Sequence, residues 1–210
     1  RCTVHFSQRH LIFGFRAAAI VSLQTTYAVW PSGLRMAERM ALRPVTGERI
    51  LEIGCGLALS SLVAHRRGAQ VTASDCHPLT HAFLEENTRL NGLPPITYRH
   101  GLWGSAKLRD DGLPMLTSSK ETSISGEFDL IVGSDILYER DDAGALAHFI
   151  QRHAAPTAEV WVVDPNRGNR AAFHKHMALA GFAMSEQILD LSASLDAPAY
   201  RGRMLTYSRS

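Results

Sequence analysis

The chain has 210 residues, of which 45% are hydrophobic and 20% charged, and a net charge of +2. This length suits one α/β domain with a substantial core, so we expect a single domain over residues 1–210. The charge is not gathered into the basic face that nucleic-acid binding needs. No apolar run reaches the roughly 20 residues of a membrane helix. Three sparse cysteines without a CxxC pair indicate a reducing compartment. We expect a cytoplasmic protein, acting as a monomer, without a nucleic-acid or membrane partner.

Apolar periodicity predicts a helical N-terminal extension over residues 1–42, with an amphipathic helix over 10–23, and then alternating strands and helices. Strands are expected at residues 49–53, 70–74, 96–99, 128–132, 160–163, 183–189 and 204–207. Helices are expected at residues 57–67, 78–91, 143–153 and 169–180. The polar stretch 104–126 is predicted to be a flexible surface loop. This alternation is typical of an α/β domain, a Rossmann-like, seven-stranded, mostly parallel sheet with helices on both faces.

The sharpest motif is the loop Glu-Ile-Gly-Cys-Gly at residues 52–56, between the first predicted strand and the next helix. Gly54 and Gly56 allow the backbone to turn tightly and to approach a ligand without a Cβ in the way. Asp75 ends the next strand about twenty residues later, where a carboxylate can accept hydrogen bonds from a ribose diol. A lone GxG also serves simply to turn a chain, but this context predicts a nucleoside cofactor.

The residues around this turn favour S-adenosylmethionine over NAD as the cofactor. A dinucleotide fingerprint would carry its third glycine at position 59, where this chain has Leu59. Ala58 and Leu59 fill the space that a pyrophosphate needs at the helix N-terminus. The carboxylate of Glu52 would attract a positively charged aminoacyl group and repel a phosphate. A nicotinamide-dependent oxidoreductase is therefore disfavoured, and the expected product is S-adenosylhomocysteine.

A second motif, Gly-Ser-Asp-Ile-Leu-Tyr-Glu at residues 133–139, follows the fourth predicted strand. Ligands of doubly wound sheets bind outside the carboxyl ends of the strands, so Asp135 and Tyr138 should reach the same edge as Asp75. Methylation of planar amide or base nitrogens usually calls on a Pro-Pro-Tyr segment, and Ile136-Leu137 replace those prolines. The alternative is that Asp135 only caps the following segment and Tyr138 is half-buried packing.

These motifs, in this order, resemble the small-protein-lysine methyltransferase family that is marked by a D-x-x-Y motif. Within that family, Asp164-Pro165-Asn166-Arg167 is similar to the branch that methylates the electron-transfer flavoprotein β-subunit and to its bacterial relatives. The resemblance extends from about Tyr27 to Gly181. It rests on Val29-Trp30-Pro31-Ser32-Gly33, the glycine loop, Asn87 with Asn91-Gly92-Leu93, Leu102-Trp103 and Asp135-Ile136-Leu137-Tyr138.

The resemblance implies a role for each of these positions. The residues implied to line the cofactor are Trp30, Gly54, Cys55, Gly56, Asp75, Trp103 and Ser134. A tryptophan offers an adenine ring a flat apolar partner. Asp135 is expected to orient the acceptor amine, and Tyr138 to form a hydrogen-bonding wall. Asp164 would assist, and Arg167 would meet an acidic group on the target. The family commonly has an acid where this chain has Leu102.

The sequence therefore predicts an S-adenosylmethionine-dependent methyltransferase that N-methylates a lysine side chain of a protein substrate. Two alternatives remain open at this point. A small-molecule methyltransferase would share every cofactor residue, and a non-catalytic S-adenosylmethionine-binding interaction module would keep the fold. No metal is expected, because His77 and His81 have helical i,i+4 spacing but no third ligand.

Overall fold

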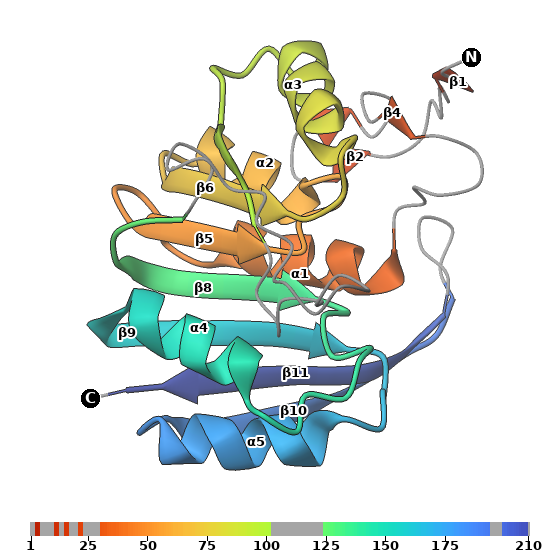
Figure 1. Cartoon of the computed structure of the whole chain (residues 1–210). Helices are drawn as coiled ribbons and strands as arrows, with labels where there is room; N and C mark the ends of the chain where they lie inside the picture. Colours follow the sequence, from red (N-terminus) through yellow and green to blue (C-terminus); the bar gives the residue numbers. More distant parts are fainter. Residues whose placement is uncertain are drawn as a thin grey trace, which may run out of the picture.

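A seven-stranded sheet with helices on both faces forms the body of the protein in the computed structural model (Figure 1). The structure describes residues 30–101, 124–193 and 199–209, and four two-residue strands before them. The strands of the large sheet are β5 (Arg49–Ile53), β6 (Gln70–Asp75), β7 (Thr97–His100), β8 (Phe128–Ser134), β9 (Ala154–Asp164), β10 (Ala183–Leu191) and β11 (Tyr200–Ser208). The expected fold class is confirmed.

The strand order is β10-β11-β9-β8-β5-β6-β7. The five strands from β7 to β9 run parallel, whereas β11 is antiparallel to both of its neighbours, β9 and β10. The chain builds outward from β5 to β6 and β7, then crosses to β8 on the other side of β5. This reversal is the topological switch point, where open α/β sheets bind their ligands.

Helices cover both faces of the sheet, and each face has its own hydrophobic cluster. The helices are α1 (Pro31–Leu42), α2 (Leu59–Arg66), α3 (Thr80–Leu90), α4 (Ala145–His153) and α5 (Arg170–Leu179). Side chains alternate along β8, so that Leu130 joins the cluster beneath α1, α2 and α3, and Ile131 joins the cluster beneath α4 and α5. The central strands are thus buried on both faces, as their continuous apolar runs predict.

Two helices begin later than the sequence predicts, because a left-handed residue precedes each of them. Ala58, with φ 58°, precedes α2, and Gly144, with φ 70°, precedes α4. A left-handed backbone cannot continue into a right-handed helix, so the first turn has to start after it. The helix predicted at residues 78–91 is also shorter, since α3 starts at Thr80 and Pro78 lies outside it.

The N-terminal extension is helical only in part. α1 confirms a helix at its end, but Thr3–Val4 pairs with Val21–Ser22, and Leu11–Ile12 pairs with Phe15–Arg16, each as antiparallel strands. The amphipathic helix expected over residues 10–23 is therefore wrong where these strands lie. Gly14 is one feature of the sequence that disfavours this helix, because a glycine inside a helix costs about 1 kcal/mol relative to alanine.

The predicted loop 104–126 lies outside the described residues except for its last three, which form neither helix nor strand. None of the helices in residues 30–101, 124–193 and 199–209 is both long and apolar enough to cross a membrane.

The buried centre of the sheet yields a stability prediction. Leu130 is fully buried between β8 and the α1–α3 layer, whereas Leu179 is exposed at the end of α5. We expect Leu130→Ala to lower the free energy of unfolding by about 2–5 kcal/mol, through lost burial and the cavity left behind. The matched control Leu179→Ala should change it by less than about 0.5 kcal/mol. Urea denaturation measures both, and equal losses would contradict the assigned core.

Candidate active site

The glycine loop after β5 has the backbone conformation that its sequence predicts. Gly54 and Gly56 have φ angles of 63° and 50°, in the left-handed region that favours glycine. A Cβ added at Gly56 would meet no atom within 4 Å, so this part of the loop borders open space. The Cys55 N–H donates to the Ser74 carbonyl at 3.0 Å, which ties the loop to the end of β6. The result is a tight, partly accessible turn of backbone at the switch point.

Asp75 connects the glycine loop to the segment that follows β6. Its Oδ2 accepts a hydrogen bond from the Gly56 N–H at 2.9 Å, and its Oδ1 accepts one from the His77 N–H at 2.9 Å. The structure thus brings together the two predicted cofactor elements. Each carboxylate oxygen can accept more than one hydrogen bond, so Asp75 keeps acceptor capacity for hydroxyl donors such as a ribose diol.

Glu52 takes a different place from the one expected. Its carboxylate is buried, and Oε2 accepts hydrogen bonds from the Ser61 N–H at 2.9 Å and from the Ser61 hydroxyl at 2.5 Å. Burial raises the pKa of Glu52 to about 7. The side-chain alternation of β5 turns Glu52 toward α2, so the expected direct contact with an aminoacyl group finds no support. Its observed role is to hold α2 against the sheet.

The Asp-x-x-Tyr segment leaves β8 through a tight backbone turn. Asp135 has a left-handed φ of 57°, and its N–H donates to the Val163 carbonyl at 2.8 Å. A Cβ added at Gly133 would lie 2.6 Å from the Ile136 Cδ1, so the Ile136 side chain packs closely over this glycine and would have to shift for a larger residue. Tyr138 is 52% exposed, and partial burial raises the pKa of its hydroxyl.

A capping role for Asp135 is not realised. The N-terminus of α4 is capped by Asp141 instead, whose carboxylate accepts hydrogen bonds from the Ala145 and Leu146 N–H groups at 2.9 Å each. The Asp135 carboxylate is 13% exposed and faces the loop after β9. It is therefore placed at the carboxyl edge of the sheet, as the motif predicts.

The partner of Asp135 in that loop is Arg167. The guanidinium donates from Nε to Oδ1 and from Nη2 to Oδ2, both at 2.9 Å, which is a bidentate ion pair. The sequence predicts separate roles for the two residues, with Arg167 meeting an acidic group on the target. The structure gives it an acid of the same chain. Only the position of Arg167 after the neighbouring parallel strand hinted at this pairing.

Asp164 organises the loop that carries Arg167. Its buried carboxylate accepts the Arg167 N–H at 3.0 Å and lies 3.5 Å from the Arg170 Nε. Burial raises the pKa of Asp164, and the Arg170 charge opposes that rise. Asp164 thus holds the loop that carries Arg167. It could contact a substrate only if its bonds to Arg167 and Arg170 changed.

The N-terminus of α1 closes another side of the site. Trp30 immediately precedes α1 and is 58% exposed, so its ring is available to a flat ligand. Ser134 faces the first turn of α1, since a Cβ at Gly33 would lie 3.8 Å from its Oγ. The Ser32 hydroxyl hydrogen-bonds the Tyr200 hydroxyl at 2.9 Å, which joins α1 to β11. Trp103 lies outside the described residues.

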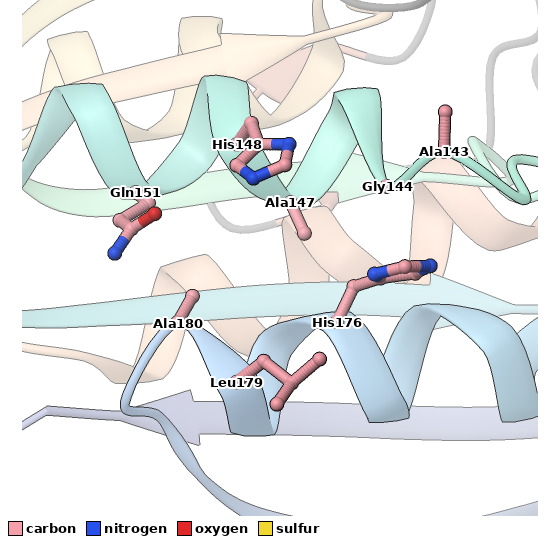
Figure 2. A pocket seen from close by; sticks show the side chains of 8 residues that line it. All are labelled: Ala143, Gly144, Ala147, His148, Gln151, His176, Leu179 and Ala180. Atoms are coloured by element: carbon pink, nitrogen blue, oxygen red, sulfur yellow. The ribbon is translucent and has the colours of Figure 1, made fainter.

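A cavity elsewhere in the molecule is lined by none of these residues. It has a volume of about 200 Å³ between α4 and α5, and Figure 2 shows His148 on α4 and His176 on α5 among the residues that line it. In the described residues no three His, Cys, Asp or Glu side chains gather closely enough to hold a metal ion. The chemistry-bearing residues are instead gathered where β5, β6, β8 and β9 end, at the edge where the arrows of Figure 1 point.

Residues 24–179 match the protein family described as lysine methyltransferase. The chain belongs to this family. It is 27% identical over 164 residues to the rat electron transfer flavoprotein beta subunit lysine methyltransferase, covering 75% of this chain and 58% of the relative. The mouse protein N-lysine methyltransferase METTL21A is 32% identical over 120 residues, 54% of this chain and 48% of the relative. The rat histone-arginine methyltransferase METTL23 is 29% identical over 131 residues, with shares of 60% and 53%. The chain thus spans about half the length of these relatives.

Solved structures confirm the fold. A methyltransferase from Pyrococcus furiosus superposes with a TM-score of 0.68 at 16% identity, covering 95% of this chain and 91% of that one. The ribosomal protein L11 methylase from Lactobacillus delbrueckii subsp. bulgaricus gives a TM-score of 0.58 at 21% identity, covering 84% and 78%. This chain therefore shares its fold with methyltransferases of distant sequence.

Asp75 provides a test of the cofactor site. Asp75→Ala should weaken binding of S-adenosylhomocysteine by about 1.5–3 kcal/mol, the scale of hydrogen bonds to a charged group. The control Asp142→Ala removes an exposed carboxylate that forms an ion pair with Arg140, and should leave the affinity unchanged. Isothermal titration calorimetry measures both, with NAD as a ligand that should not bind. Tight binding of NAD would contradict the assignment of the cofactor.

Glu52 gives a prediction for the pH dependence of stability. Its pKa is raised from 4.5 to about 7, so the folded protein holds this proton more tightly than the unfolded chain does. The free energy of unfolding should therefore fall as the pH rises from about 4.5 to 7 and stay low above that range. Glu52→Gln should remove this dependence and, at pH 8, exceed the wild type by up to roughly 3 kcal/mol.

The matched control is Glu127→Gln, which neutralises an exposed carboxylate. Urea denaturation at pH 5, 6.5 and 8 compares the three proteins. Parallel pH curves for the wild type and Glu52→Gln would refute the assigned burial.

Proposed function

We propose that this protein is an S-adenosylmethionine-dependent methyltransferase that N-methylates a lysine side chain of another protein. The observation that carries the proposal is the placement of Asp135 and Tyr138 at the same sheet edge as the glycine loop and Asp75. The family and its relatives named as lysine methyltransferases support a lysine acceptor.

The residues at the switch point fit the cofactor. Gly54 and Gly56 both have left-handed backbones, and Gly56 borders open space. Asp75 has spare acceptor capacity for a ribose diol, and the exposed ring of Trp30 suits an adenine. When bound, S-adenosylmethionine supplies an electrophilic methyl group. A C–N bond forms to the acceptor, the C–S bond breaks, and its electron pair stays on the sulfur of the product S-adenosylhomocysteine.

The acceptor side of the site is built to orient a nitrogen. In-line displacement depends mainly on position, so a fixed hydrogen-bond acceptor close to the nitrogen is the main contribution a protein can make. Asp135 meets this need, because its backbone is held by the bond to Val163 and by the contact of Gly133 with Ile136. Tyr138 stands two residues beyond Ile136 and offers an aromatic wall with a hydroxyl.

The exposure of the site favours a protein acceptor over a small molecule. Trp30 and Tyr138 are both more than half exposed, whereas small-molecule sites bury most of their ligand. A lysine side chain presented by another protein can enter such an open edge. A non-catalytic binding module would have no need for a carboxylate on a left-handed backbone beside the cofactor loop.

Arginine is a second candidate acceptor. The Asp135 carboxylate already holds a guanidinium, that of Arg167, in a bidentate geometry. Relatives of this chain include proteins named as histone-arginine methyltransferases. The chemistry of the acceptor residue therefore has to be measured directly.

We also propose a monomeric, cytoplasmic enzyme. Asp75, Asp135 and Arg167 come from one chain, so the described site needs no residue from a second copy. The three cysteines are sparse and form no CxxC pair, which fits a reducing compartment. Sedimentation equilibrium of the purified protein tests the first statement, and localisation of a tagged full-length protein tests the second.

A transfer assay tests the proposed function. The purified chain and tritiated S-adenosylmethionine are incubated with recombinant electron transfer flavoprotein β-subunit, with core histones, and with a dialysed lysate. Mass spectrometry then locates the methyl group. Methyl-lysine supports the proposal and methyl-arginine supports the second candidate. Label recovered only in small molecules would overturn a protein acceptor.

The acceptor site predicts a separation between cofactor binding and chemistry. Asp135→Ala should reduce methyl transfer by roughly a hundredfold, as loss of an orienting group can, and leave S-adenosylhomocysteine affinity within severalfold. Asparagine tolerates a left-handed φ better than alanine, so Asp135→Asn separates loss of charge from backbone strain. It should keep the melting temperature and still lose at least about tenfold in rate.

Tyr138→Phe and Tyr138→Ala distinguish the hydroxyl of Tyr138 from its ring, since Phe should do less harm if the ring acts mainly as a wall. Asp142→Ala, an exposed carboxylate in the same connection, is the control for the Asp135 variants. Melting temperature, calorimetry and single-turnover transfer on one preparation measure all of them. Normal activity of folded Asp135→Ala would exclude this mechanism.

A further inference from the structure

The ion pair between Asp135 and Arg167 raises a question about the proposed reaction, on which this inference rests. Both carboxylate oxygens of Asp135 accept a hydrogen bond from the guanidinium, each at 2.9 Å. The Arg167 side chain is 44% exposed, whereas that of Asp135 is 13% exposed, so the arginine covers the acid from the solvent side. A positive charge thus lies against the carboxylate that is meant to receive the acceptor nitrogen.

Arg167 is held in this position by contacts that do not involve a target. Its N–H donates to both oxygens of the buried Asp164, at 3.0 and 3.3 Å. Asn166, with a left-handed φ of 64°, turns the loop just before it. The Asn169 side chain then donates to the Leu137 carbonyl at 2.9 Å, which ties the same loop to the Asp-x-x-Tyr segment. The loop and the motif therefore form one connected structure.

The charges around Asp135 come from several elements. The groups whose electrostatics include Asp135 are Tyr138 on its own segment, Asp164 at the end of β9 and Tyr200 on β11. Asp164 is paired with Arg170 at 3.5 Å, and Asp135 with Arg167. Asp135 and Asp164 are thus each paired with an arginine.

This balance matters because a lysine is a nucleophile only after it has lost a proton to water. An uncompensated carboxylate would stabilise the ammonium form and raise the pKa of the bound amine. A carboxylate and a guanidinium together carry no net charge, so the pair stabilises the ammonium form much less. Each carboxylate oxygen still has acceptor capacity left for an amine N–H. The pair can orient the nitrogen without holding its proton.

We propose that Arg167 is a positioning residue that compensates the charge of Asp135, so that the acceptor amine binds beside the cofactor in its neutral, nucleophilic form. Arg167 acts through Asp135 and does not itself touch the reacting atoms. The alternative role, a placeholder that the acceptor has to displace, makes the opposite kinetic prediction.

The experiment compares the wild type with Arg167→Met, which keeps the apolar stem and removes the charge, and with Arg167→Lys, which keeps the charge. Arg140→Met is the control, since it removes another exposed arginine from an ion pair with Asp142. The probe for binding is n-butylamine, a mimic of the lysine side chain, titrated by NMR into the S-adenosylhomocysteine complex between pH 6.5 and 10. Methyl transfer to the same amine from tritiated S-adenosylmethionine is followed over the same range.

In the wild type and in Arg140→Met, affinity for n-butylamine should rise with pH, because the neutral form binds. In Arg167→Met the ammonium form should bind, with about tenfold higher affinity than in the wild type at pH 7, while transfer at pH 7 falls about tenfold and recovers toward pH 10. The acid limb of the rate profile should therefore move up by about one pH unit, and Arg167→Lys should restore it.

Identical pH profiles in the wild type and a folded Arg167→Met would overturn the proposal. So would faster transfer by Arg167→Met at pH 7, which is the result expected of a displaced placeholder. Melting temperatures establish that each variant is folded. Absence of transfer by the wild type to every acceptor would refute the proposed function, and the binding profiles would still decide the role of Arg167.

Discussion

The parallel pairing of β5 with β6 and with β8 is the constraint on which the site depends. Ile53 aligns with Ser74 on one side and with Gly133 on the other, so all three strands end at the same level. The residues that follow each strand are then neighbours by construction. This is how the Gly56 N–H comes within 2.9 Å of Asp75, although nineteen residues separate them. A change of register by one residue in either pair would separate the cofactor loop from the acceptor segment.

Backbone conformation then decides which way the side chains at this edge point. Asp135 and Asn166 both adopt left-handed φ angles, and each begins a turn that leaves a neighbouring parallel strand. The two turns face each other, and the carboxylate of the first meets the guanidinium carried by the second. Asp164 lies at the buried end of β9, and hydrogen bonds from the Arg167 N–H in that second turn offset the cost of burying its carboxylate. The buried carboxylate of Asp164 thus helps to fix the position of Asp135 through Arg167.

Much of this could be predicted from the sequence, because the strands are short apolar runs and ligands of such sheets bind at their carboxyl ends. The period of two along β5 also fixes that Glu52 shares a face with Ile50, but sequence alone cannot tell which face meets α2. The late start of α2 follows from a left-handed alanine, a conformation that residue type does not announce. The pairing of Arg167 with Asp135 joins two turns of unknown shape, so periodicity holds no signal for it.

The tight contact of Gly133 with Ile136 has a consequence for anyone who would transplant this acceptor segment into another scaffold. The polar residues at either end of Asp-x-x-Tyr are the obvious ones to copy, yet Ile136 between them packs back against Gly133 on the strand that the segment leaves. Copying only the aspartate and the tyrosine would leave out this packing. Gly133 and Ile136 should therefore be transferred together with Asp135 and Tyr138.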